Sequence, residues 1–192
     1  TTLINLALAL VTIFEPIYLY QIGYGLNDIM LFYLIVYVLY FLIIPLGAKF
    51  ARRRGYEIAM FIGSIFFIVF YVALFWIAKY PILFYITPII FAIQKTFYWP
   101  AYHANFARFS DKEEEGKEIS ALTIAASLVF IIGPVLAGFI ISQWGYGVLF
   151  TIASVIFLAS NIPTLITKEN LKSGTFSYKE AYQDLFRKEN RK

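Results

Sequence analysis

Apolar residues run through the chain in six long blocks, and short polar or glycine-containing stretches separate these blocks. Each block is close to the ~20 residues that an α-helix needs to cross a bilayer, because a helix rises about 1.5 Å per residue and the hydrocarbon core is about 30 Å thick. The pattern therefore predicts six transmembrane helices. Their expected ranges are 3–21, 29–50, 56–77, 81–103, 119–142 and 146–166.

A polar tail follows the sixth block. Ser177 and Glu180 form a capping-box pattern, in which side chains of the first helical turn pair with free backbone N–H groups. Apolar residues then recur at helical spacing. They are Tyr178, Ala181, Tyr182, Leu185 and Phe186. We expect an amphipathic helix on the cytoplasmic membrane surface, so that residues 1–167 form the six-helix bundle and residues 168–192 form a cytoplasmic linker or surface helix.

The composition indicates a membrane protein. Hydrophobic residues make up 60% of the 192 residues and charged residues 15%, which differs strongly from a soluble globular domain. Mean hydropathy is +0.72. The chain has no cysteine, which excludes disulfides and thiolate metal sites. His103 is the sole histidine and has no acidic partner at metal-ligand spacing, so we expect neither a metal nor another cofactor.

Basic residues gather on one side of the predicted membrane. The joints after the second and fourth blocks and the tail are rich in Lys and Arg, whereas the joints on the opposite side hold Lys79 alone. Because cytoplasmic loops carry an excess of Lys and Arg, both termini are expected in the cytoplasm of a multi-pass protein of the cell membrane. Anionic lipid head groups are natural neighbours for the cluster of Arg52, Arg53 and Arg54. Nucleic-acid binding would need a basic stripe beyond this joint, and the sequence has none.

The segment "GAKFARRRG" resembles the loop between the second and third helices of the major facilitator superfamily. That loop carries the pattern Gly-x-x-x-Asp-Arg-x-Gly-Arg-Arg, often called motif A. Gly47 matches the leading glycine and Arg53 the arginine after the acid, while Arg52 stands where the family usually has Asp. The resemblance implies a cytoplasmic gate at Gly47 and at the three arginines.

A second match lies in "SLVFIIGPVLAGFIIS", where Gly133, Pro134 and Gly138 resemble the Gly-Pro-x-x-Gly-Gly of the family's motif C. The family associates this motif with proton-coupled efflux, so the resemblance implies efflux as one form of transport. Small residues also share one helical face of this block: Ala121, Ala125, Gly133 and Ala137. In lipid, such a face lets a helix approach closely. The approaching helix belongs either to the same bundle or to a second half of the transporter.

The helix count, the short first loop and the passage "YWPAYHANFARFSDKEEEGKEIS" also resemble the amino-terminal half of a facilitator transporter. The resemblance thus covers essentially the whole chain and implies an all-α membrane protein with six transmembrane helices, one half of the facilitator fold. Such transporters form the solute path between two six-helix halves. The implied partners are the lipid bilayer, a small-molecule solute, protons, and a second half from a longer chain or from a homodimer partner.

Ionisable residues inside a transmembrane helix cost about 2.5 to 3.5 kcal/mol each, so they are functional candidates by default. Glu15 in the first block and Lys95 in the fourth are the clear examples, and Gln94 and Tyr98 lie near Lys95. A structural explanation exists for each charge. Pro16 frees a backbone carbonyl that a protonated Glu15 can satisfy, and Lys95 can extend to the cytoplasmic interface. Glu15, Gln94, Lys95 and Tyr98 form the candidate solute or proton site.

Two roles are open to each charge. Glu15 either couples transport to protons or binds the solute, while Lys95 either pairs with Glu15 in one access state or receives an anionic group of the solute. The predicted function is secondary active transport of a small solute by alternating access. A scaffold or partner-binding module that keeps the fold is the alternative, and it would pack Glu15 and Lys95 with no cavity between them. We expect no enzyme, because no cluster of catalytic groups occurs at one depth.

Overall fold

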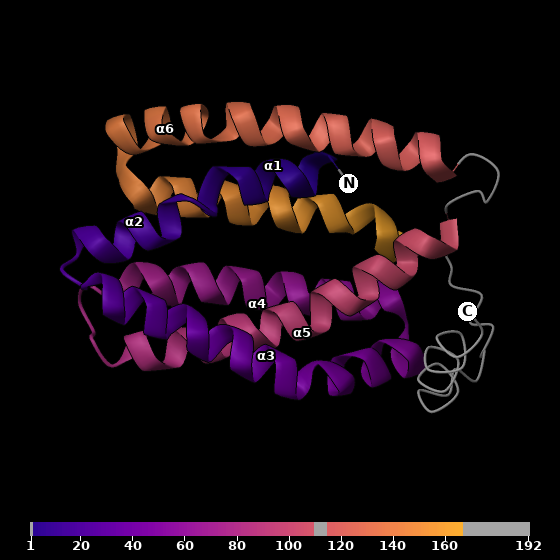
Figure 1. The fold of residues 1–192 in the computed structure, drawn as a ribbon, viewed down its shortest axis with the longest axis horizontal. Coiled ribbons are helices and arrows are strands. Elements are labelled where there is room, and N and C mark those ends of the chain that lie inside the picture. The colour runs from indigo at the N-terminus through magenta and orange to yellow at the C-terminus, as the bar shows by residue number, and fades with distance from the viewer. Residues whose placement is uncertain (1, 110–114, 167–192) are drawn as a thin grey trace, which may run out of the picture.

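The computed structural model describes residues 2–109 and 115–166, and the regular structure in these residues is entirely helical. Figure 1 shows helices that lie side by side along the long axis of the bundle. The elements are α1 (Thr2–Val11), α2 (Phe14–Gln21), α3 (Leu26–Arg54), α4 (Tyr56–Trp76), α5 (Leu83–Phe109) and α6 (Glu115–Ile166). The tail helix predicted within 168–192 lies outside the described residues.

Four helical stretches of the described chain are long and apolar enough to cross a membrane. They are Leu3–Gln21, Leu26–Arg54, Tyr56–Trp76 and Thr123–Ile162. α5 does not meet this standard, and its sequence includes Gln94, Lys95 and two internal prolines. The all-α class is therefore confirmed for the described residues, whereas six separate crossings stay a prediction.

The last two predicted helices form one element, α6, which folds back on itself at Gly145. Gly145 has φ 81° and ψ 177°, far from helical values. A side chain disfavours this φ, so glycine permits the reversal without a connecting loop. Figure 1 shows the two parts of α6 running in opposite directions. We call residues 115–144 the first arm and residues 146–166 the second arm.

A single residue, Gly55, joins α3 to α4, and its φ of 108° again suits glycine. The second predicted block ended at residue 50, but α3 continues to Arg54 and includes all three arginines in its last turn. Positive charge is favourable there because the final carbonyl groups of a helix carry partial negative charge. The arginines therefore belong to the helix end and not to a loop.

The two ends of the bundle differ in their connections. Figure 1 shows the α3–α4 junction at the same end as the start of the first arm and the finish of the second arm. The α2–α3 turn, the α4–α5 connection and the reversal of α6 lie at the opposite end. Arg52, Arg53 and Arg54 thus mark one end, and Lys79 lies at the other.

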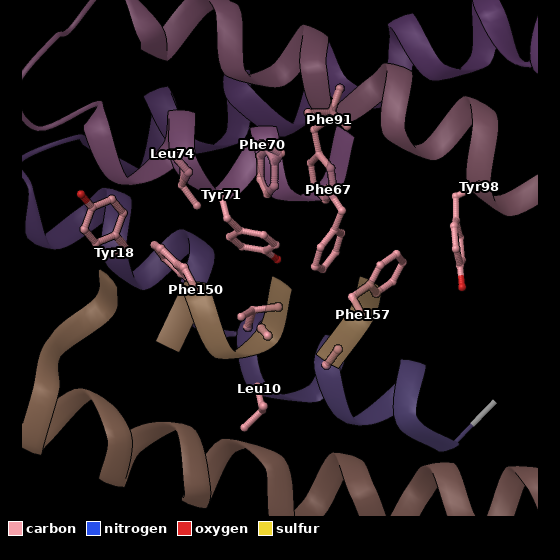
Figure 2. Close-up of a cluster of buried hydrophobic side chains, with 14 of the residues drawn as sticks. Leu10, Tyr18, Phe67, Phe70, Tyr71, Leu74, Phe91, Tyr98, Phe150 and Phe157 are labelled. Atoms are coloured by element: carbon pink, nitrogen blue, oxygen red, sulfur yellow. The ribbon is translucent and has the colours of Figure 1, made fainter. Parts of the chain in front are cut away.

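α4 is the most enclosed of the long helices. It packs on α5 and α6, and half of its apolar window is buried, compared with 11% for the window in α6. Aromatic rings of α4 stack on both neighbours, Phe70 on Phe91 of α5 and Phe67 on Phe157 of the second arm (Figure 2). The outward sides of α3 and the first arm remain apolar and exposed, as lipid contact requires.

Two glycines let α5 approach its neighbours closely. Gly47 of α3 lies against Thr96, and a Cβ at Gly47 would overlap the Thr96 carbonyl oxygen. Gly63 of α4 lies against Tyr98, where an added Cβ would be 2.8 Å from the Tyr98 Cβ. Because Thr96 directly follows Lys95, these contacts fix the point on α5 from which the Lys95 side chain extends.

Candidate functional site

A cavity of about 440 Å³ lies among the helices and is bordered by residues of α1 to α5 and of both arms of α6. Its lining includes three of the four residues predicted for a solute or proton site, Glu15, Gln94 and Lys95. Most of the remaining lining is aromatic, with Tyr37 and Trp99 near the charged groups. The cavity thus combines two opposite charges with apolar walls.

A break in the first predicted span positions Glu15. α1 ends at Val11 and α2 begins at Phe14, with a two-residue turn between them. Pro16 has no N–H to donate to the carbonyl of Thr12, which explains why the helix does not continue through this point. Glu15 consequently lies in the first turn of α2, where its side chain is only 3% exposed.

Two tyrosine hydroxyl groups hold the Glu15 carboxyl group. Tyr33 of α3 donates to Oε2 at 3.1 Å, and Tyr71 of α4 donates to Oε1. An ionised carboxylate accepts on both oxygens, so this arrangement matches the charged form, and a proton on the carboxyl group would remove the charge that strengthens both bonds. The charge state of Glu15 therefore affects how α2 is tied to α3 and α4.

Lys95 is half-buried, and its ammonium group lies over two aromatic rings. Its Nζ lies 4.3 Å from the ring centroid of Phe91 and 5.5 Å from that of Tyr37, distances at which a cation is attracted to a ring face. Among the described residues, Lys95 makes no ion pair within 4.0 Å, although it attracts Glu15 electrostatically. Glu15 and Lys95 therefore line one cavity without forming a salt bridge.

The other two polar residues predicted for the site separate. Gln94 is buried and borders the cavity. Tyr98 is fully buried outside the lining, and its hydroxyl donates to Oδ1 of Asn161 at 3.4 Å. Asn161 in turn donates from Nδ2 to the Ser64 hydroxyl at 3.0 Å. We call Ser64, Tyr98 and Asn161 the asparagine cluster, which joins α4, α5 and the second arm.

The motif C-like residues lie outside the cavity lining. Gly133 of the first arm contacts α1, where an added Cβ would be 2.6 Å from the Ala9 Cβ. Ala137 on the same face is fully buried, and Pro134 is half-buried. Gly138 has Phe14 nearest, at 4.0 Å from an added Cβ. In this structure the part of the small-residue face at Gly133 therefore packs against a helix of the same bundle.

The residues predicted for a cytoplasmic gate lie at the end of α3. Arg53 and Arg54 are exposed, Arg52 is half-buried, and Gly47 contacts α5 as described above. None of these four residues lines the cavity. The structure thus brings together Glu15, Gln94 and Lys95, and it places the gate residues elsewhere.

The described residues include no group of three or more His, Asp or Glu side chains that could hold a metal ion.

Sequence reasoning missed the tyrosines that complete the site. The chain has 15 tyrosines, so Tyr33, Tyr37 and Tyr71 were inconspicuous among them. A usable signal exists, because a tyrosine hydroxyl within an apolar helix usually finds a hydrogen-bond partner. Tyr33 and Tyr37 stand four residues apart, on one face of α3, and Glu15 is the acceptor for Tyr33.

Comparison with known proteins identifies the family. The chain matches the family model of the Major Facilitator Superfamily over residues 1–189. No curated protein matches it at a significant level. The family match includes all of the helices that border the cavity.

Proposed function

Because the chain belongs to the major facilitator superfamily, a family of transporters, we propose that it carries a small solute by secondary active transport with alternating access. The observation that carries this proposal is the cavity in which Glu15 and Lys95 lie unpaired with each other. Charges inside a membrane are costly and typically mark solute or proton pathways. A scaffold would have no need of such a cavity, and an enzyme would need catalytic groups that the lining does not combine.

Glu15 is the group that couples solute movement to protons in this proposal. It belongs to α2, while its two hydrogen-bond donors belong to α3 and α4. A bound proton removes the negative charge that strengthens both contacts, so the ties from α2 to α3 and α4 become weaker. Proton binding thus favours a different arrangement of the three helices, which is the requirement for coupling to alternating access. The motif C-like segment supports efflux as the direction.

A second six-helix half completes the solute path, either in a longer chain or in a second copy. A groove of about 670 Å³ along α2 and α3 shares Pro16, Tyr33 and Tyr37 with the lining of the cavity. The charged cavity therefore adjoins a concave, largely apolar face. Facilitator halves enclose the solute between such faces.

The proposed transporter crosses the membrane six times, with both termini in the cytoplasm. The apolar stretch Thr123–Ile162 has 40 residues, and an unbroken helix of that length would be about 60 Å long, roughly twice the hydrocarbon thickness. Because the chain reverses at Gly145, this stretch crosses the membrane twice in the proposed topology. α5 runs between the two ends of the bundle and supplies the sixth.

Cysteine labelling tests this topology, because the chain has no native cysteine. Asn27→Cys and Lys79→Cys are exposed and lie at the end proposed to be outside, whereas Arg53→Cys is exposed at the other end. An impermeant maleimide should label the first two variants in intact cells and the third only after permeabilisation. Labelling of Arg53→Cys alone in intact cells would contradict the orientation.

Proton movement in proteoliposomes tests the transport function. Vesicles loaded with a pH-sensitive dye are exposed to a panel of drugs, sugars, amino acids and organic anions, with the full chain or, if it is one half, with its counterpart. At least one solute class should drive proton flux, and Glu15→Gln should abolish that flux. Asp28→Asn, a change at an exposed carboxylate that caps α3, should leave it intact. Proton-independent behaviour of the unaltered protein, or equal flux in Glu15→Gln, would refute the proposal. Light scattering of the protein in detergent, corrected for bound detergent, identifies a homodimer.

A further inference from the structure

The charges of the cavity are arranged as two separate binding poles. Both oxygens of Glu15 accept tyrosine hydroxyl groups, and Lys95 lies over the rings of Phe91 and Tyr37. In surroundings of low polarity, an opposite pair within reach would gain by forming a salt bridge. Here the tyrosines hold the carboxylate from α3 and α4, and the rings hold the ammonium group, so the two charges stay apart while facing the same space.

This arrangement discriminates between solutes by their charge. A solute with a single positive charge would compensate Glu15 and leave Lys95 with an added like charge in the cavity. A solute with a single negative charge would do the reverse. Because an uncompensated charge in a poorly hydrated site is costly, both would bind weakly. A solute that carries both charges compensates both poles at once.

Each pole retains the capacity to bind such a solute. A carboxylate has about four lone-pair sites, so Glu15 can accept N–H donors from a cationic group while it keeps both tyrosine bonds. Lys95 has three N–H donors and no hydrogen-bond acceptor among the described residues. Gln94 borders the cavity beside it and adds an amide that can donate or accept.

The aromatic walls of the cavity indicate the nature of the uncharged part of the solute. Phe67 and Phe157 stack face to face with ring centroids 3.9 Å apart, and Trp99 and Phe130 also line the cavity. Aromatic walls favour an apolar or aromatic body, which can stack on them. A volume of about 440 Å³ is sufficient for a single small molecule of this kind.

We propose that the solute is a zwitterion with an apolar or aromatic body, whose cationic group binds Glu15 and whose anionic group binds Lys95. This inference rests on the proposed transport function and names the class of its solute. A proton on Glu15 removes the negative pole, so proton binding and binding of the cationic group exclude one another. Such competition exchanges the solute for a proton at a single site.

Binding measurements with matched probes test the proposal. The chain has three tryptophans, so Trp76→Phe combined with Trp144→Phe leaves Trp99 as a fluorescent reporter in the cavity. The zwitterionic probes are L-phenylalanine, with adjacent charges, and 4-(aminomethyl)benzoate, with charges at opposite ends of the ring. Their singly charged counterparts are 2-phenylethylamine and 3-phenylpropanoate for the first, and benzylamine and 4-methylbenzoate for the second.

At least one zwitterion should bind ten times more tightly than both of its singly charged counterparts. Lys95→Met should remove the advantage over the amine, and Glu15→Gln should remove the advantage over the acid. Lys79→Met is the matched control, because Lys79 also lies over aromatic rings, at 5.2 and 5.4 Å, but outside the cavity. It should leave all of the dissociation constants unchanged.

The outcomes separate this inference from the proposed function. Binding of an amine or an acid as tight as that of its zwitterion overturns the inference, and so does failure of both zwitterions to change Trp99 emission. If Glu15→Gln nevertheless abolishes solute-driven proton flux in proteoliposomes, the transport function stands and only the solute class is wrong. If that flux is absent from the unaltered protein as well, both proposals fail.

Discussion

Two polar clusters are buried in the bundle, and they differ in how their hydrogen-bonding capacity is satisfied. In the asparagine cluster, the Asn161 amide donates to the Ser64 hydroxyl and to the carbonyl of Phe157, at 3.0 and 2.8 Å. Ser64 donates to the carbonyl of Met60 at 2.9 Å. This cluster is neutral, satisfied by its neighbours, and outside the cavity lining.

The cluster around Glu15 is charged and borders a cavity. Tyr33 and Tyr71 satisfy the carboxylate only in part, and Lys95, on the same cavity, has no ionic partner among the described residues. A neutral and satisfied cluster holds helices together whether or not a solute is present. A charged cluster with spare capacity beside a cavity is stable in more than one arrangement, so solutes and protons can change its state.

A row of aromatic rings in contact links the two clusters. The ring centroids of Tyr71 and Phe67 lie 4.7 Å apart, those of Phe67 and Phe157 3.9 Å, and those of Phe157 and Tyr98 4.7 Å (Figure 2). Both clusters therefore share the same packing environment within α4, α5 and the second arm. A substitution in one cluster and a substitution of similar size in the other should therefore disturb similar packing. A difference between their effects on transport then reports the different roles of the two clusters.

Among substitutions that leave both charged residues in place, the largest effect is expected for Tyr71→Phe, which keeps the buried ring and removes the hydroxyl donor from Glu15. Hydrogen bonds to charged groups contribute about 1.5–3 kcal/mol, so solute affinity should change by about tenfold or more. The pH profile of proton-coupled flux should change with it, because the Tyr71 hydroxyl stabilises the charged form of Glu15 against protonation. Flux in proteoliposomes, measured over a range of pH, reports both effects.

A matched control exists in the same bundle. Tyr18 of α2 donates to the carbonyl of Phe75 at 2.7 Å, which is also a contact between α2 and α4 but does not involve a charge or the cavity. Tyr18→Phe should lower stability slightly and leave the solute affinity and the pH profile unchanged. Equal transport by Tyr71→Phe and the unaltered chain would show that the Glu15 cluster is structural, like the asparagine cluster.

The two charges of the site could be predicted because their cost in lipid makes them conspicuous. Glu15 and Lys95 stand out in apolar blocks of the sequence, and the structure places both at one cavity. The helical segments were equally visible from hydropathy, although the single-residue reversals at Gly55 and Gly145 were not. Those depend on backbone angles that a pattern of apolar residues does not specify.

The division of α5 between cavity and core could not be predicted from spacing alone. Phe91, Lys95 and Trp99 stand four residues apart and all line the cavity. Tyr98 is adjacent to Trp99, but one residue turns a helix by about 100°. The close contact with Gly63 holds the face of α5 that carries Tyr98 against α4. The Tyr98 hydroxyl therefore reaches Asn161 and not the cavity. A prediction of that contact would require the packing of three helices.

A smaller and different effect is expected for Asn161→Leu. Leucine is similar in size, but it removes the amide and leaves the Tyr98 hydroxyl without its acceptor in the core. Interhelical hydrogen bonds in membrane proteins contribute about 0.6 kcal/mol on average and at most about 1.7, so the free energy of unfolding should fall by about 1 kcal/mol. Unfolding in mixed micelles measures this loss, and solute affinity should stay within about twofold because the cluster lies outside the cavity.

The smallest effect is expected for Tyr98→Phe, which removes one end of the asparagine cluster and keeps its ring. The bond from Tyr98 to Asn161 is long, at 3.4 Å, whereas the Asn161 amide keeps its contacts with Ser64 and Phe157. The loss in unfolding free energy should therefore be below about 0.6 kcal/mol, and smaller than that of Asn161→Leu. Proton-coupled flux should be unchanged, in contrast with Tyr71→Phe, although both variants lose one buried tyrosine hydroxyl. A Tyr98→Phe variant with altered solute affinity would show that the asparagine cluster takes part in transport, and the division of roles between the two clusters would then be wrong.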